Sequence, residues 1–340
     1  MIIVKYSLPY TVGLLGYFDR KPTEFNNNIS DLYFSDEKFN PSARYLPGVD
    51  SEDMWNELQR IKQDHGIEMQ YVMNSSVWKN DVYTTGKQQL IDNINTVYDL
   101  GCTMLTINNM LLLRDAEFRE KIPQDIKIKL SINNKVATLE EVVFLYEYNA
   151  IENFILDRSL NRDMDELNRI DKWRQNKPRV TLTLLAQEGC LTKCPWKNTC
   201  DNMITTFHQY DEHEVNDLKS LHSSHFCSIH YSNHPADMLK SPWITPGGVN
   251  LYEDVVDYMK ISGRMQPVNV LGKVFEAYIN KDHSVDVFDI LTGHAGSGLA
   301  GKTITDLETH GYSAKVNNCK NRCQDCNFCD TIYSKLVDED

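Results

Sequence analysis

Short runs of β-branched and aromatic residues alternate along the chain with longer segments in which apolar residues recur every three or four positions. Runs of the first kind predict β-strands, and segments of the second kind predict amphipathic helices. Eight strands are predicted, at residues 2–8, 31–34, 67–73, 102–107, 126–132, 153–156, 180–185 and 257–261.

Six helices are predicted between or after these strands, at residues 52–64, 87–100, 112–121, 139–148, 163–175 and 268–280. In the second of them a helical stripe of side chains can rest on a sheet, formed by Leu90, Ile94, Val97 and Tyr98. Thr138 directly precedes the fourth helix and Glu141 follows three residues later, which is the spacing of a capping box that fixes a helix start.

Strands that alternate with helices favour a parallel sheet, and eight such units in about 280 residues favour a closed (β/α)8 TIM-like barrel over an open doubly wound sheet. We expect the barrel to occupy residues 1–285, with an insertion at 187–236, and a cysteine-rich metal-binding segment to follow at 286–340. No GxGxxG or GxxxxGK[ST] motif follows a predicted strand, so a nucleotide-binding function lacks its usual signature. The glycine-rich residues 293–298 are interpreted as a connector.

Composition and charge narrow the possible partners. The 340 residues are 41% hydrophobic, as in an ordinary globular protein, and 35 basic against 48 acidic residues give a net charge of −13. This charge makes RNA a less favourable partner than a small molecule or a peptide. The apolar stretch 104–113 is shorter than the roughly 20 residues that a membrane span requires. The start of the chain lacks the features of a signal peptide, so we expect no membrane association and a cytoplasmic location.

Eight of the nine cysteines fall into two groups. The first group is Cys190, Cys194, Cys200 and Cys227, and the second is Cys319, Cys323, Cys326 and Cys329. In a reducing compartment such groups indicate metal ligation, and disulfides are the alternative. The remaining Cys102 lies in a predicted strand and is interpreted as a small core residue.

The first group follows the seventh strand. Three thiols within eleven residues, with Pro195 after Cys194, favour an iron–sulfur cluster over zinc. The loops after the strands meet at the catalytic face of a barrel, so a redox role is expected there. Nearby His222, His225 and His230 could form a second metal site, but we interpret them as solvated surface.

The second group has spacers of three, two and two residues and includes the CxxxCxxC pattern of radical S-adenosylmethionine enzymes. That triad normally follows the first strand of a barrel, whereas this one follows every barrel element. The second group is therefore predicted to bind either a second iron–sulfur cluster or zinc.

Polar residues recur just after the predicted strands, where they would share the catalytic face. They include Asn74, Ser75, Asn108, Asn109, Asn133, Asn134, Asp157, Arg158, Gln187, Glu188, Lys260 and Arg264. A role in turns is the alternative for each of them. Lys260 and Arg264 are predicted to bind a carboxylate or phosphate, with a structural salt bridge as the alternative.

The segment 255–265 reads Val-Val-Asp-Tyr-Met-Lys-Ile-Ser-Gly-Arg-Met and resembles a conserved block of the collagenase-like peptidases of unassigned mechanism, the U32 family. The segment 156–160 resembles another strand end of that family, and the resemblance covers roughly residues 67–280. The family includes anaerobic ubiquinone-biosynthesis hydroxylases and RNA-hydroxylating proteins. The resemblance implies a barrel in which Cys190, Cys194, Cys200 and Cys227 hold a [4Fe–4S] cluster for oxygen-independent hydroxylation.

We therefore expect an iron–sulfur-dependent oxidoreductase that hydroxylates a small-molecule or biosynthetic substrate. Its catalytic candidates are Lys260, Arg264, Asp157 and Glu188. It would require an electron-transfer partner and could form hetero- or homo-oligomers. The alternatives are a peptidase, although HExxH and GxSxG motifs are absent, a non-catalytic iron–sulfur subunit of a heterodimer, and an RNA-modifying hydroxylase.

Overall fold

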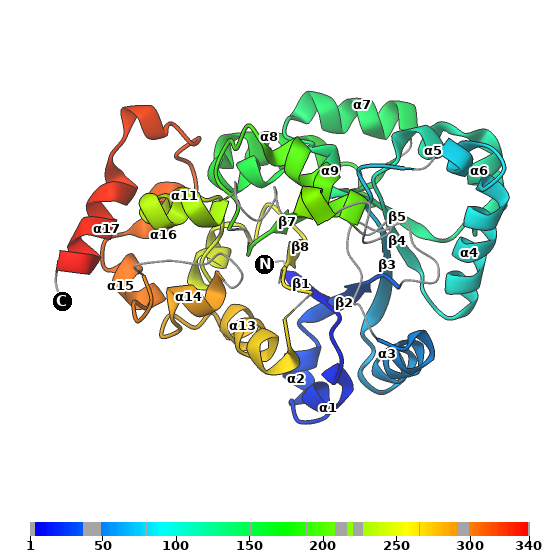
Figure 1. Ribbon diagram of the computed structural model, residues 1–340, viewed down its shortest axis with the longest axis horizontal. Helices are drawn as coiled ribbons and strands as arrows, with labels where there is room; N and C mark the ends of the chain where they lie inside the picture. The colour runs from blue at the N-terminus through cyan, green and yellow to red at the C-terminus, as the bar shows by residue number, and fades with distance from the viewer. Residues whose placement is uncertain are drawn as a thin grey trace.

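Eight parallel strands close into a barrel in the order β1 to β8, as expected (Figure 1). The structure is a computed structural model that describes residues 4–36, 49–78, 80–149, 151–187, 189–207, 216–219, 227–264, 266–291 and 299–338. The strands are β1 (Lys5–Pro9), β2 (Ile29–Phe34), β3 (Glu68–Met73), β4 (Met104–Ile107), β5 (Lys127–Leu130), β6 (Asn153–Ile155), β7 (Thr181–Leu185) and β8 (Tyr258–Lys260). Pairing of Lys260 with Ser7 closes the barrel between β8 and β1. The predicted (β/α)8 fold is confirmed.

Five of the predicted helices form within two residues of their expected bounds. They are α3 (Ser51–His65), α4 (Lys87–Asp99), α7 (Leu139–Asn149), α8 (Met164–Arg174) and α13 (Val268–Asn280). The capping box before α7 forms as expected, because Thr138 N–H donates to Glu141 Oε2 at 3.0 Å and Glu141 N–H donates to Thr138 Oγ1 at 3.2 Å.

The prediction of one helix over 112–121 was wrong. Two helices, α5 (Met110–Arg114) and α6 (Ala116–Lys121), meet at Asp115, whose backbone is extended. The Asp115 carboxylate accepts a hydrogen bond from Phe118 N–H at 2.9 Å and so starts a new helix.

Further helices lie among the described residues. They are α1 (Leu14–Phe18), α2 (Thr23–Asn26), α9 (Lys197–Phe207), α11 (Cys227–Asn233), α12 (Asp237–Lys240), α14 (Val287–Ile290), α15 (Ile304–Glu308), α16 (Tyr312–Val316) and α17 (Phe328–Asp338). Single 3₁₀ turns lie at Asn80–Tyr83, Ile132–Asn134, Arg158–Arg162, Gly247–Leu251 and Cys323–Asp325. Within the described ranges no helix combines the length and apolar character that a membrane span requires.

The two faces of the strands have different chemistry. Outward side chains build the apolar core under the helices; for example, the Phe34 ring lies 4.9 Å from Trp55 of α3 and 5.6 Å from Tyr71 of β3. Inward side chains are largely polar and include Ser7, Asp31, Tyr33, Gln70, Thr106, Lys129, Thr183, Tyr258 and Lys260. Barrel interiors are usually filled by branched apolar residues, so a polar interior indicates a function there.

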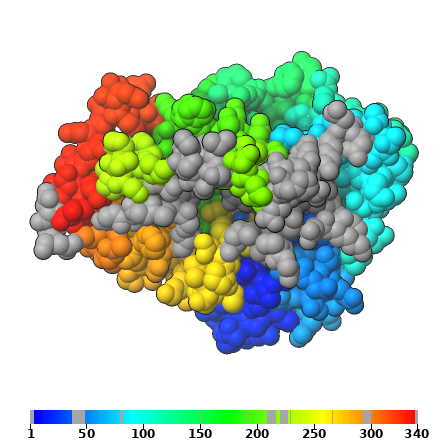
Figure 2. Space-filling view, viewed as in Figure 1, coloured from blue at the N-terminus to red at the C-terminus, as the bar shows by residue number. Residues whose placement is uncertain are grey.

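The C-terminal helices α15, α16 and α17 form one end of the molecule beside α11 (Figures 1 and 2). They are packed against the rest of the chain: Tyr312 OH donates to Leu239 O at 2.6 Å, and the Tyr312 ring lies 5.7 Å from that of the buried Trp243. The division at residue 285 remains a prediction from the sequence.

Candidate active site at the carboxyl end of the barrel

Lys260 is the last residue of β8, and its side chain enters the barrel from the carboxyl end. The Lys260 ammonium lies 3.6 Å from the centre of the Tyr33 ring, and the Tyr33 hydroxyl donates to Ile261 O at 2.6 Å. No carboxylate in the described part of the chain lies within ion-pair distance of Lys260. Its contact is therefore with an aromatic face, and the structural salt bridge considered above is not formed there.

The surroundings of Lys260 disfavour its charge. Burial lowers the pKa of Lys260 to about 7, and the nearby charges of Arg264 and Lys129 act in the same direction, whereas Asp31 opposes them. A lysine with a pKa near neutrality can accept and return a proton at physiological pH, which an ordinary lysine cannot do.

A buried polar group lies deeper in the barrel. Ser7 Oγ donates to Asp31 Oδ1 at 2.6 Å, and Lys129 Nζ lies 3.3 Å from Asp31 Oδ2. Asp31 is 0% exposed and Lys129 3% exposed. Our sequence analysis did not identify these three residues. Each of them is a polar residue within a predicted strand, and this is the sequence feature that could have identified them.

Two further interior side chains have unused hydrogen-bonding atoms. Both side-chain amide atoms of Gln70 and the hydroxyl of Thr106 are buried without a partner in the structure. Buried polar atoms are nearly always hydrogen-bonded, so these groups suit a polar ligand or ordered water inside the barrel.

Arg264 reaches the same aromatic ring as Lys260. Its guanidinium lies 5.6 Å from the centre of the Tyr33 ring and donates from Nη1 to Ser35 Oγ at 3.1 Å. The preceding Gly263 has φ +107°, and a Cβ there would lie 2.8 Å from Leu271 Cδ2. Glycine is thus required for the turn that brings Arg264 to this position.

The other two catalytic candidates are placed differently. The Asp157 carboxylate caps the turn Arg158–Arg162 by accepting from Ser159 N–H at 2.8 Å, which is a structural role. A catalytic role for Asp157 stays a prediction. Glu188 lies outside the described residues, as do His222, His225 and residues 293–298.

The asparagines after the strands connect neighbouring loops. Asn108 Nδ2 donates to Ser75 O at 3.1 Å, Asn133 Nδ2 to Asn74 O at 2.9 Å, and Asn134 Nδ2 to Asn108 O at 3.1 Å. Asn109 caps α5. These contacts support the turn interpretation for the asparagines.

The first cysteine group lies on the segment after β7 and on α11. Its four members are partly buried. Nowhere in the described ranges do three or more His, Cys, Asp or Glu side chains already adopt a metal-binding arrangement. The assignment of a cluster to these cysteines therefore stays a prediction. Cys102 is fully buried, and burial raises its pKa to about 12, in keeping with a core residue.

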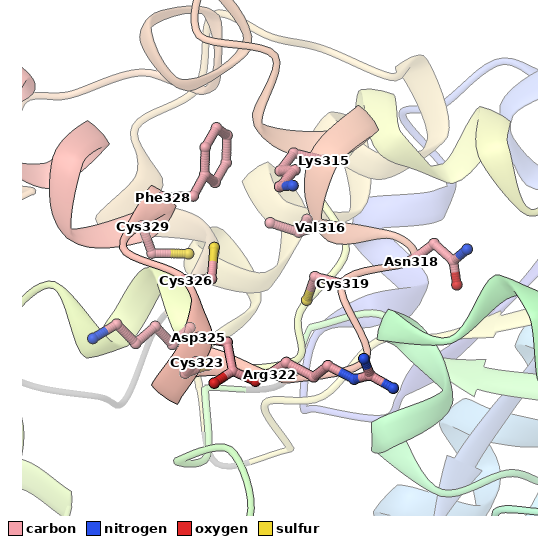
Figure 3. A pocket seen from close by; sticks show the side chains of 11 residues that line it. Lys315, Val316, Asn318, Cys319, Arg322, Cys323, Asp325, Cys326, Phe328 and Cys329 are labelled. Atoms are coloured by element: carbon pink, nitrogen blue, oxygen red, sulfur yellow. The ribbon is translucent and has the colours of Figure 1, made fainter.

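The second cysteine group lines a cavity of about 270 Å³, which we call the C-terminal cysteine cavity (Figure 3). Its lining residues are Lys240, Lys315, Val316, Asn318, Cys319, Arg322, Cys323, Asp325, Cys326, Phe328 and Cys329. Burial raises the pKa of the Cys329 thiol to about 12, with smaller effects from the neighbouring cysteines and from two cations.

Comparison with known proteins adds two similarities. No family model matches the chain. The sequence is 23% identical over 295 residues to the "Uncharacterized protease MJ1657" of Methanocaldococcus jannaschii, covering 84% of this chain and 82% of the relative. The fold is similar to "The Structure of the U32 Peptidase Mk0906", with a TM-score of 0.50 and 15% identity over 77% of this chain and 94% of the other. The similarity to the solved structure supports the barrel fold, and the name of the similar curated protein describes an uncharacterized protease.

The matched solved structure covers 77% of this chain, so the similarity concerns the barrel fold.

Arg264→Lys tests whether the arginine at the carboxyl end of the barrel binds an anion. Lysine keeps the charge and loses the planar pair of donors, so we expect weaker binding of a carboxylate ligand, by about 1.5–3 kcal/mol, with the thermal stability unchanged. Ligand titration and thermal unfolding of the same sample measure both quantities. Unchanged affinity together with reduced stability would assign Arg264 a structural role.

Proposed function

We propose that this protein is an enzyme that acts at the carboxyl end of its barrel on a peptide or other small molecule carrying a carboxylate. The observation that carries the proposal is Lys260, a lysine with a near-neutral pKa on an aromatic ring beside Arg264. Peptide hydrolysis is the reaction favoured by the names of the two similar proteins.

In this reaction the neutral Lys260 amine accepts a proton from water as the water oxygen attacks the peptide carbonyl carbon. The C–N bond then breaks, and the proton passes to the leaving nitrogen, which gives a carboxylate and an amine. Arg264 orients the substrate by binding a carboxylate. The water-poor environment that lowers the pKa of Lys260 also strengthens these electrostatic contacts.

A defined library of synthetic peptides, with free or amidated C-termini, tests this function. Mass spectrometry should find cleavage by the wild type, with free C-termini preferred. Lys127→Met is the matched control. Lys127 lies on β5 at a position whose side chain faces inward, as that of Lys260 does, but it is exposed and lies at the opposite end of the barrel. Lys260→Met should lose the cleavage that Lys127→Met retains. Absence of cleavage by the wild type would exclude peptide hydrolysis for the sequences in the library.

Oxygen-independent hydroxylation that depends on a [4Fe–4S] cluster is the second candidate function. The observation that favours it is the hydrogen bond from Tyr231 OH to Gly189 O, 2.8 Å long, which joins the helix carrying Cys227 to the loop carrying Cys190. A cluster there would transfer electrons to an external partner protein. This chain's own residues would bind the substrate at Arg264 and exchange a proton at Lys260.

Anaerobic purification distinguishes the two functions. If the second candidate is right, the protein is brown and contains iron and sulfide, and Cys194→Ala removes the metal of the first group while leaving that of Cys319 to Cys329. An iron and sulfide content that Cys194→Ala leaves unchanged, combined with peptide cleavage by the wild type, would support the hydrolase and exclude the redox enzyme.

A further inference from the structure

Arg162 is a buried cation that forms no ion pair with a carboxylate of the described residues. It ends the turn Arg158–Arg162 and is 1% exposed. Its Nη2 donates to Ser241 O, to Leu239 O and to Tyr312 OH, all of them uncharged. Nε and Nη1 have no partner in the structure, and none of the carboxylates in the described ranges forms an ion pair with it. A buried charge is costly unless an opposite charge compensates it.

The surroundings of Arg162 lead to the C-terminal cysteine cavity. Lys320 N–H, directly after Cys319, donates to Arg162 O at 2.8 Å. Cys329 Sγ lies 3.6 Å from Leu239 O, the carbonyl that also accepts from Arg162 Nη2 at 3.5 Å. Arg162 is therefore held next to two of the four cysteines of the second group.

The cavity itself is rich in thiols and cations. Cys326 and Cys329 point toward one another in Figure 3, and the cavity is also lined by Lys240, Lys315 and Arg322. Lys240 ends α12 and forms ion pairs with Asp237 of the same helix at 2.8 Å and with Asp330 of α17 at 2.7 Å. An anionic group bound in the cavity would have both Arg162 and Lys240 close to it.

We propose that the four cysteines of this cavity ligate a [4Fe–4S] cluster, and that Arg162 and Lys240 compensate its negative charge. A cluster bound by four thiolates carries a negative charge in a small volume. This charge would compensate the buried Arg162 guanidinium, which has no carboxylate partner among the described residues. This site is separate from Lys260 and from the first cysteine group, and it does not depend on which proposed function is right.

The size of the cavity favours a cluster over a single zinc ion. The cavity of about 270 Å³ is many times the 10–15 Å³ that one water molecule needs. In a [4Fe–4S] cluster each thiolate binds a different iron, so the four sulfurs stand farther apart.

The test uses the full chain carrying Cys194→Ser and Cys200→Ser, so that metal at the first group is not counted. After anaerobic purification we expect about four iron and four sulfide per chain, with a brown colour. Adding Cys326→Ser should abolish both, and because Cys326 is exposed its replacement should spare the fold. Asn327→Ser, at the exposed neighbouring position, is the matched control and should retain the cluster. Zinc in place of iron would overturn the cluster assignment, and no metal that depends on Cys326 would overturn the site.

Redox titration tests the charge compensation. Arg162→Met removes a positive charge beside the cluster, so its reduction potential should become more negative, whereas Arg162→Lys should stay close to the wild type. Lys240→Gln provides the same test at a partly exposed position if Arg162→Met does not fold. Potentials unchanged in these charge-removing variants would overturn the proposed role of the two cations.

Discussion

The rate of the wild-type enzyme on its substrate should rise with pH through a midpoint near 7, and Lys260→Arg should abolish that rise. The pKa of Lys260 is lowered to about 7, chiefly by burial, so the side chain loses its proton over this range. Below the midpoint the amine is protonated and cannot act as a base. Arginine remains charged at every accessible pH, so Lys260→Arg should be slower by about 10²–10⁴-fold.

Lys127→Arg is the control for this prediction and should keep the wild-type pH profile. A wild-type rate that is flat between pH 6 and 9, or an active Lys260→Arg variant, would contradict the role of Lys260 as the base. Initial rates on one cleaved peptide, measured across that range, provide the comparison.

The same pKa shift has a consequence for stability that needs no substrate. Between the folded pKa of about 7 and the ordinary value of 10.5, the unfolded chain holds a proton that the folded chain does not. The contribution of Lys260 to the free energy of unfolding therefore rises with pH across this window. Its destabilising effect is complete below pH 7 and absent above 10.5. Lys260→Met should accordingly stabilise the protein more at pH 6 than at pH 10.

The barrel could be predicted from the sequence because each strand is a short apolar run between amphipathic helices. All eight runs became strands, with ends that moved by up to three residues. The break at Asp115 was missed, since the helical pattern continues through it and the capping of Phe118 N–H depends on an extended backbone at that one residue.

The candidate site could be predicted only in part. Lys260 and Arg264 were identified from a sequence block, but their contact with Tyr33 joins β8 to β2 and depends on barrel closure. The cysteine groups are visible as spacings, whereas Arg162 comes from a distant part of the chain. Its proximity to Cys319 and Cys329 follows from the packing of the C-terminal helices against α12.

The contacts among Ser7, Asp31 and Lys129 also depend on closure of the barrel. These residues lie on β1, β2 and β5, and β5 is not hydrogen-bonded to either of the other two strands. Their side chains meet across the interior of the barrel. The alternation of residues along one strand predicts which side chains face the interior of the barrel. It does not predict which of these side chains contact one another across the interior.

Asp31→Asn should lower the free energy of unfolding by about 3–5 kcal/mol, because it leaves Lys129 as a buried charge without its partner. Asparagine has nearly the same shape as aspartate and keeps an acceptor for Ser7, so the loss reports the charge more than the packing. Equilibrium denaturation in urea measures the change.

A double variant that removes the charges of both Asp31 and Lys129 is the control for Asp31→Asn. Asp31→Asn combined with Lys129→Met should recover most of the lost stability, because no uncompensated charge then remains in the barrel. Glu117→Gln, which breaks exposed ion pairs with Lys87 and Lys121, should change the stability little. If Asp31→Asn proved as mild as Glu117→Gln, the interior of the barrel would not hold the ion pair that the structure describes.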